Sequence, residues 1–101
     1  MAQFDVYENL NKLNNKKIPY FIDVQHPILN HIDTKVVIPL SYEEKEIKTI
    51  APKFDINGIN LILLTSQISA IRPVFLGQKV CSLKDNRDEI ISSIDFLITG
   101  F

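Results

Sequence analysis

The sequence predicts a small, mainly antiparallel β-sheet or barrel that carries one C-terminal helix. At least five short segments have strand-like composition and are separated by turn residues, and an Asn-Gly pair at 57–58 joins two apolar segments. The only long segment with helical periodicity is at the end, in residues 82–101. Strands followed by one helix are typical of a compact sheet with the helix packed on it. At 101 residues the chain is expected to form one domain, residues 1–101.

Two strands are predicted before residue 30. Residues 4–7 alternate apolar and polar side chains, and residues 19–25 are rich in β-branched and aromatic side chains. Residues 8–17, with four Asn and three Lys, are expected to form a solvated loop or an irregular hairpin connection. His26-Pro27 ends the second strand, because proline has no amide hydrogen and restricts the residue before it. Ile28 and Leu29 are therefore expected in a loop.

The middle of the chain predicts a third strand and a hairpin. Residues 34–40 form the strand, and Pro39 is expected to force an edge position or an exit from the sheet. Residues 41–50 are read as a short helical turn or a charged connection. Asn57-Gly58 predicts a tight hairpin turn because both residues tolerate positive φ.

After the hairpin, residues 59–65 are nearly all apolar, which predicts a central strand buried on both faces. Residues 66–70 are expected to turn, and residues 71–76 to be extended again. The segment that starts at Ser82 begins a helix, since Asp85 follows three residues later, as in a capping box. Gly100 is expected to end this helix in a left-handed conformation.

The helix has more apolar residues than one buried face needs. At about 100° per residue, Ile90, Ile94 and Leu97 form one stripe that can pack on the sheet. Ile91 and Ile98 lie about 80–100° from the start of this stripe, and Phe96 points nearly opposite. We therefore expect a partner, either a second copy or another protein, to cover the surplus.

Composition excludes several classes of function. A chain that is 46% hydrophobic and 23% charged is expected to fold, and its formal net charge of −1 lacks the positive bias of nucleic-acid binders. No apolar run approaches the roughly 18–20 residues of a membrane span. The first residues do not resemble a secretory signal, and the single Cys81 fits a reducing compartment, so a cytoplasmic protein is expected.

The sequence gives no positive sign of catalysis, a metal or a cofactor. His26 and His31 are five residues apart in a loop and lack the spacing of metal ligands. Asp23, Asp55 and Asp95 are separated in sequence, and each is given a surface or capping role. Cys81 is read as a small packed residue near the helix start rather than a nucleophile.

Taken in order, several stretches together resemble the CcdB family, the toxins of a bacterial toxin–antitoxin pair that poison DNA gyrase. The similarity covers nearly the whole chain and ends on glycine among apolar residues. The stretches that carry it are Gln3-Phe4-x-Val6-Tyr7, Phe21-Ile22-Asp23-Val24-Gln25, Val37-Ile38-Pro39-Leu40, Leu64-Thr65 with Ser69-Ala70, Pro73-Val74 with Gly77, and residues 87–100.

The resemblance implies an SH3-like barrel with a C-terminal helix, assembled as a homodimer whose helix ends lie side by side. It implies a toxin without enzymatic activity, which binds the gyrase A subunit and traps the gyrase–DNA cleavage complex. A CcdA-like antitoxin would neutralise it, and operator DNA would be bound only through the antitoxin complex.

The family's gyrase-binding positions map onto two parts of this sequence. They supply apolar contact, close backbone approach and polar pairing. The residues are Ile28, Leu29, Asp95, Ile98, Thr99, Gly100 and Phe101.

This chain departs from the family pattern at two of these positions. Thr99 stands where the best-known form has Trp, and Asp95 where it has Asn. Two other functions therefore stay open: a ribonuclease toxin on the related barrel, and a homologue that binds its antitoxin without acting on gyrase.

Overall fold

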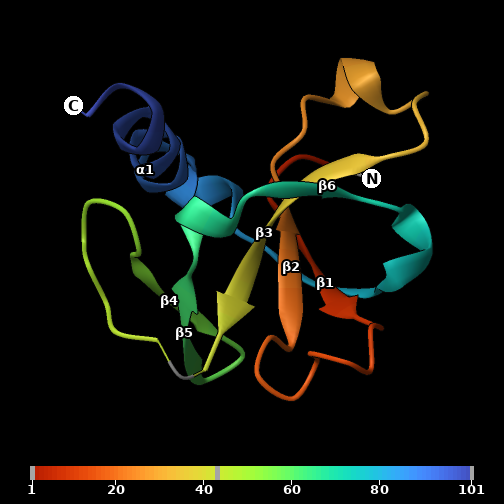
Figure 1. The fold of residues 1–101 in the computed structure, drawn as a ribbon, viewed down its shortest axis with the longest axis horizontal. Coiled ribbons are helices and arrows are strands. Elements are labelled where there is room, and N and C mark those ends of the chain that lie inside the picture. Colours follow the sequence, from red (N-terminus) through yellow and green to blue (C-terminus); the bar gives the residue numbers. More distant parts are fainter. Residues whose placement is uncertain (1, 43, 101) are drawn as a thin grey trace.

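The computed structural model describes residues 2–42 and 44–100, and it contains a curled antiparallel sheet with one helix at its end (Figure 1). The strand order is β4-β5-β3-β2-β1-β7, and β6 pairs with β3 beside this path. The sheet forms a half-barrel, which confirms the predicted mainly β, SH3-like fold with a C-terminal helix. The elements are β1 (Asp5–Asn9), β2 (Tyr20–Asp23), β3 (Lys35–Ser41), β4 (Lys53–Ile56), β5 (Ile59–Leu63), β6 (Ser69–Ile71), β7 (Leu76–Ser82) and α1 (Arg87–Thr99).

Within the residues that the structure describes, four short 3-10 turns connect these elements. They are η1 (Pro27–Leu29), η2 (Thr65–Gln67), η3 (Pro73–Phe75) and η4 (Lys84–Asn86).

The core lies inside the curl of the sheet, where buried apolar side chains from β1 to β5 meet the first half of α1. Each fully buried aliphatic side chain contributes about 1.5–3 kcal/mol to folding. The fully buried members are Val6, Ile22, Ile38, Leu40, Ile56, Leu61, Leu63 and Ile90, with Phe4, Phe54 and Leu83 nearly so.

The predicted hairpin at Asn57-Gly58 is confirmed. Asn57 has φ +53° and Gly58 has φ +85°, which joins β4 to β5 with Ile56 opposite Ile59. The Gly58 amide also donates a 2.7 Å hydrogen bond to Asp55 Oδ1. β5 is paired on both sides, as predicted, although its first two residues are exposed.

The prediction that Pro39 forces an edge or an exit is wrong, since β3 has partners on both sides. On one side β3 pairs with β2; on the other it pairs with β6 at residues 35–37 and with β5 at residues 40–41. The Leu64 amide donates to the Pro39 carbonyl, so the main chain of Pro39 faces the second side. Its missing amide hydrogen therefore falls where η2 carries the chain from β5 to β6, and no ladder hydrogen bond is lost.

The predicted extension of residues 71–76 is also wrong. β6 ends at Ile71, and Pro73 begins the turn η3, because proline fixes φ and cannot donate to a ladder. The next strand, β7, starts at Leu76 and pairs with β1, an element that its mixed Gly-Gln-Lys sequence did not indicate. Residues 44–50 are an irregular connection with one isolated bridge between Ile47 and Ala51.

The helix begins later than predicted. α1 starts at Arg87 after the turn η4, and no side chain caps it at Asn86. Ser82 belongs to β7, and its hydroxyl accepts a 3.3 Å hydrogen bond from the Lys84 amide, so the proposed capping box does not form. Asp88 and Glu89 lie in the first turn, where the helix dipole favours negative charge.

The buried stripe of α1 differs from the predicted one in its second half. Ile90 is fully buried, and Ile94 packs against the core together with Ile91, which was expected off the stripe. Leu97 is 38% exposed, because α1 packs through its first half near η2 and its end projects beyond the sheet (Figure 1).

A polar residue completes the buried face of α1. Ser93 is buried, and its hydroxyl lies 3.0 Å from Thr65 Oγ1 and donates to the Ile90 carbonyl at 2.8 Å. The contact joins η2 to the middle of α1. Apolar periodicity does not identify such a residue, since serine carries no apolar signal.

Ile90 is expected to be the main anchor of α1. Ile90→Ala should lower the free energy of unfolding by about 2–5 kcal/mol, because it leaves a cavity in a fully buried site. Ile47→Ala, at a largely exposed position, is the control and should cost about 1 kcal/mol or less. Urea unfolding followed by circular dichroism measures both, and equal losses would contradict the role of Ile90.

Candidate protein-binding site

The predicted site residues lie in two exposed segments. Asp95, Ile98, Thr99 and Gly100 are at the end of α1, whereas Ile28 and Leu29 belong to η1. Figure 1 shows both segments at the upper end of the molecule, α1 on the left and the η1 loop on the right. One chain therefore presents them as two separate patches. Phe101 lies outside the described residues.

The end of α1 is apolar and exposed. Ile98 is 75% exposed, and Phe96 and Leu97 are each more than one-third exposed. Gly100 has φ +79° and donates its amide to the Phe96 carbonyl at 2.9 Å, which confirms the predicted left-handed end of the helix. This face, defined by Phe96, Leu97 and Ile98, has the composition of a protein contact.

The polar members of the α1 end differ in what they can offer. The Thr99 hydroxyl donates a 2.7 Å hydrogen bond to the Asp95 carbonyl inside the helix, so it remains available chiefly as an acceptor. Asp95 is exposed and has a carboxylate that a partner's donor can reach.

Phe96 differs from Ile98 in its surroundings. It lines a hollow of about 390 Å³ together with Lys48, Thr49 and polar residues on the first turns of α1. The connection before β4 therefore lies beside Phe96, whereas Ile98 does not line this hollow.

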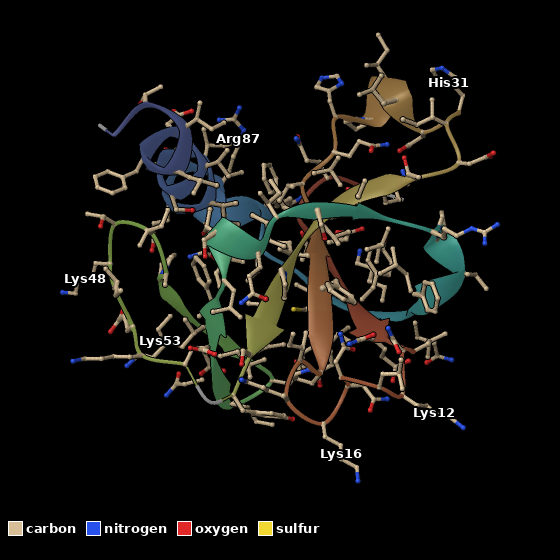
Figure 2. All side chains as sticks on the ribbon, in the orientation of Figure 1. Lys12, Lys16, His31, Lys48, Lys53 and Arg87 are labelled. Carbon is tan, nitrogen blue, oxygen red and sulfur yellow. The ribbon has the colours of Figure 1, made fainter. Side chains whose placement is uncertain are left out.

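The η1 turn holds Ile28 and Leu29 outward. His26 Nδ1 accepts the Ile28 amide at 3.1 Å, and the amides of Leu29 and Asn30 donate to His26 and Pro27 carbonyls. Ile28 is 74% exposed and Leu29 is 42% exposed, so neither side chain anchors the loop in the core. His31 lies at the tip of the same loop, at the end opposite Lys12 and Lys16 (Figure 2).

A buried polar cluster below η1 was not predicted. Asp23 is fully buried, which corrects the surface or capping role given to it. Its Oδ1 accepts the Gln25 amide at 2.9 Å, while its Oδ2 makes no hydrogen bond among the described residues and lies 4.0 Å from Lys35 Nζ. Lys35 is itself 4% exposed. The sequence signal was an acid at the end of one strand and a base at the start of the next.

Within residues 2–42 and 44–100, no group of three His, Cys, Asp or Glu could hold a metal ion. No helix in the same residues is long and apolar enough to cross a bilayer. Cys81 lies in β7, opposite Val6, and packs partly buried against the core, as expected for a small packed residue. Burial and the nearby Asp5 carboxylate raise the pKa of its thiol, which disfavours the reactive thiolate.

Comparison with known families gives one match over residues 3–100, to the family described as CcdB protein. The chain belongs to the CcdB family. The match covers nearly all of the sequence, so the resemblance noted from separate stretches holds for the chain as a whole. CcdB membership supports a role as the toxin of a toxin–antitoxin system. No curated protein matches the sequence.

One solved structure has a similar fold to this chain but little sequence similarity. It is described as an endoribonuclease from Mycobacterial species and superposes with a TM-score of 0.75. The alignment covers 97% of this chain and 90% of the other, at 14% sequence identity. At this identity the likeness shows that the two chains share a fold.

The buried Asp23 makes the stability of this CcdB chain depend on pH. Burial raises the pKa of the Asp23 carboxyl above its ordinary value of 3.8, outweighing the hydrogen bond from the Gln25 amide and the charge of Lys35. A raised pKa means that the folded state binds this proton more tightly than the unfolded chain does. The resulting stability is fully present below pH 3.8 and is lost as pH rises through the folded pKa.

Asp23→Asn should therefore remove this dependence. The free energy of unfolding of the wild type minus that of the variant should fall as pH is raised from about 3 to about 7. Urea unfolding at a series of pH values measures it. Asp55→Asn, at an exposed position of the β4–β5 hairpin, controls for loss of a carboxylate. A difference that rises with pH would contradict the direction assigned to Asp23.

Proposed function

We propose that this CcdB-family chain is the toxin of a type II toxin–antitoxin system that binds the DNA gyrase A subunit and traps the gyrase–DNA cleavage complex. The observation that carries the proposal is the exposed apolar end of α1, formed by residues that match the family's gyrase-binding positions. Ile98 supplies the largest exposed apolar surface there, and Gly100 adds no side chain beyond it. A face of this kind binds a protein and performs no chemistry of its own.

The functional unit in this proposal is a homodimer of single-domain chains. A two-fold axis beside α1 would bring two Leu97 and Ile98 faces together, giving one continuous apolar surface of the kind that protein interfaces bury. It would also present two η1 turns, so that Ile28 and Leu29 add contacts at the flanks. The exposed half of α1 supports this arrangement, because the sheet of its own chain does not cover it.

The remaining partners follow from the same proposal. The protein would act in the bacterial cytoplasm, a CcdA-like antitoxin would neutralise it, and operator DNA would be bound only by the toxin–antitoxin complex. The net charge of −1 agrees with a toxin that does not bind DNA alone.

Thr99 sets the strength of the proposed gyrase contact. Its short side chain offers much less apolar area than the family's Trp, and its hydroxyl is already bonded to the Asp95 carbonyl. More of the contact must then come from Ile98, η1 and Phe101. A third possible function, a homologue that binds its antitoxin without acting on gyrase, rests on this substitution.

A second candidate is ribonuclease activity, which the fold shared with a described endoribonuclease favours. A hollow of about 410 Å³ lies between the β1–β2 loop, β6 and η3. Its described lining is amide, hydroxyl and apolar apart from the guanidinium of Arg72. RNA cleavage by general acid–base catalysis needs a proton acceptor such as His or a carboxylate. This lining favours the gyrase-binding proposal over cleavage.

Expression in bacteria tests the proposal as a whole. Induced expression should arrest growth, and an altered gyrase A subunit that resists the toxin should relieve the arrest. Purified protein should leave RNA intact when gyrase is absent. Harmless expression of folded protein would support the gyrase-inactive reading, and RNA cleavage would support the ribonuclease reading; either result overturns the proposal.

The site is tested by shortening the chain. Removal of Gly100 and Phe101 should abolish binding to the gyrase A subunit in surface plasmon resonance, because the proposed contact ends there. Light scattering should give twice the chain mass of 11.6 kDa for both wild type and truncated protein. Unchanged gyrase binding by the truncated dimer would refute the site, and a wild-type monomer would refute the dimer.

A further inference from the structure

The η1 turn has no apolar anchor of its own. None of its three residues is buried, and its two large side chains point into solvent. An exposed three-residue turn with so few packed atoms is normally mobile. What fixes its position must therefore come from polar contacts to the strands on either side.

Two side chains make such contacts from below the turn. Gln25 Nε2 donates to the Leu29 carbonyl at 3.1 Å, and the Val36 amide donates to Gln25 Oε1 at 3.1 Å, so one amide group links the turn to β3. The Lys35 ammonium donates to Asn30 Oδ1 just after the turn. Both Gln25 and Lys35 are nearly fully buried, which restricts their rotamers.

Asp23 contacts both residues, the main chain of Gln25 and the side chain of Lys35. Its Oδ1 accepts a hydrogen bond from the main-chain amide of Gln25, which fixes the backbone from which that side chain extends, and its Oδ2 lies 4.0 Å from Lys35 Nζ. A buried charge pair adds little net stability compared with apolar residues of the same shape, but it penalises arrangements that separate the charges. The cluster is therefore better suited to fixing a geometry than to stabilising the fold.

We propose that Asp23, Gln25 and Lys35 are positioning residues that hold Ile28 and Leu29 in the orientation that the gyrase A subunit recognises. The proposal rests on the gyrase-binding function proposed above. Gln25 holds the Leu29 end of the turn and Lys35 holds Asn30, while Asp23 fixes the backbone of Gln25 and lies against the Lys35 ammonium. A turn ordered in advance loses less conformational entropy when it binds.

Gln25→Met and Lys35→Met test the proposal, because each removes one tether and keeps a long side chain. Lys79→Met is the matched control, since it removes an ion pair of 3.4 Å with Asp5 at the exposed strand β7. Backbone order parameters from ¹⁵N relaxation are measured for the whole chain. In both tether variants, the order parameters should fall from about 0.85 to below about 0.6 at Leu29, Asn30 and Ile32. The order parameters of β5 and α1 should stay unchanged.

Gyrase binding gives the second readout. Each tether variant should bind the gyrase A subunit about tenfold more weakly or worse, the size expected for losing one hydrogen bond of a buried or charged group. Lys79→Met should bind as the wild type does. If Lys35→Met fails to fold, Gln25→Met alone decides, because it leaves no charge unpaired.

The outcomes separate this inference from the proposed function. Turn order parameters equal to those of the wild type, or a loss spread evenly over the sheet, would overturn the positioning role. A mobile turn with wild-type gyrase affinity would overturn it as well. If the wild type itself does not bind the gyrase A subunit, the proposed function fails, while the order parameters still report whether the cluster holds the turn.

Discussion

Strand β3 is the element on which the rest of the sheet depends. It pairs with β2 along one side and with β6 and then β5 along the other, so it joins the two halves of the curl. The change of partner leaves Ile38 and Pro39 without a paired residue on that side, and Pro39 needs no partner for an amide hydrogen. The same strand begins with Lys35 and includes Val36, the residues that connect the sheet to η1. A single strand thus closes the core and supports one of the two exposed patches.

The other patch depends on how little of α1 the sheet covers. The helix is anchored by Ile90, Ile94 and the Ser93 hydroxyl in its first half, and the sheet ends before its last turn. Apolar residues in that turn are left partly exposed because the sheet does not extend to them, and Ile98 is the most exposed of them. An interaction site can arise in this way without weakening the core, because the two sets of side chains do not overlap.

Local backbone chemistry could be predicted from the sequence, whereas relations between distant segments could not. Asn57-Gly58 and Gly100 were placed correctly because positive φ is a property of the residue itself. Leu97 was misplaced because the helical period shows which residues share a face but not where the sheet ends. Pro39 was misplaced because a gap between partner strands leaves no local trace, and β7 because half-exposed edge strands tolerate Gly, Gln and Lys. For the site, the exposure of Ile28 and Ile98 was expected, but the Asp23–Lys35 pair beneath the turn was not. Asp23, which was given a surface or capping role, becomes the partner of Lys35 only when β2 and β3 are placed side by side.

The hydroxyl contact between Thr65 and Ser93 limits the ways in which α1 can lie on the sheet. Both residues are buried, so a helix turned about its axis or shifted by one turn would leave the Thr65 hydroxyl without this partner, at a cost of about 1–3 kcal/mol. Apolar contacts alone would tolerate such shifts, since Ile90, Ile91 and Ile94 have similar shapes. One polar pair in an apolar interface therefore fixes both the rotation of the helix about its axis and its position along that axis. The Thr65–Ser93 contact, about two turns before the C-terminal end of α1, thus determines the direction in which that exposed end points.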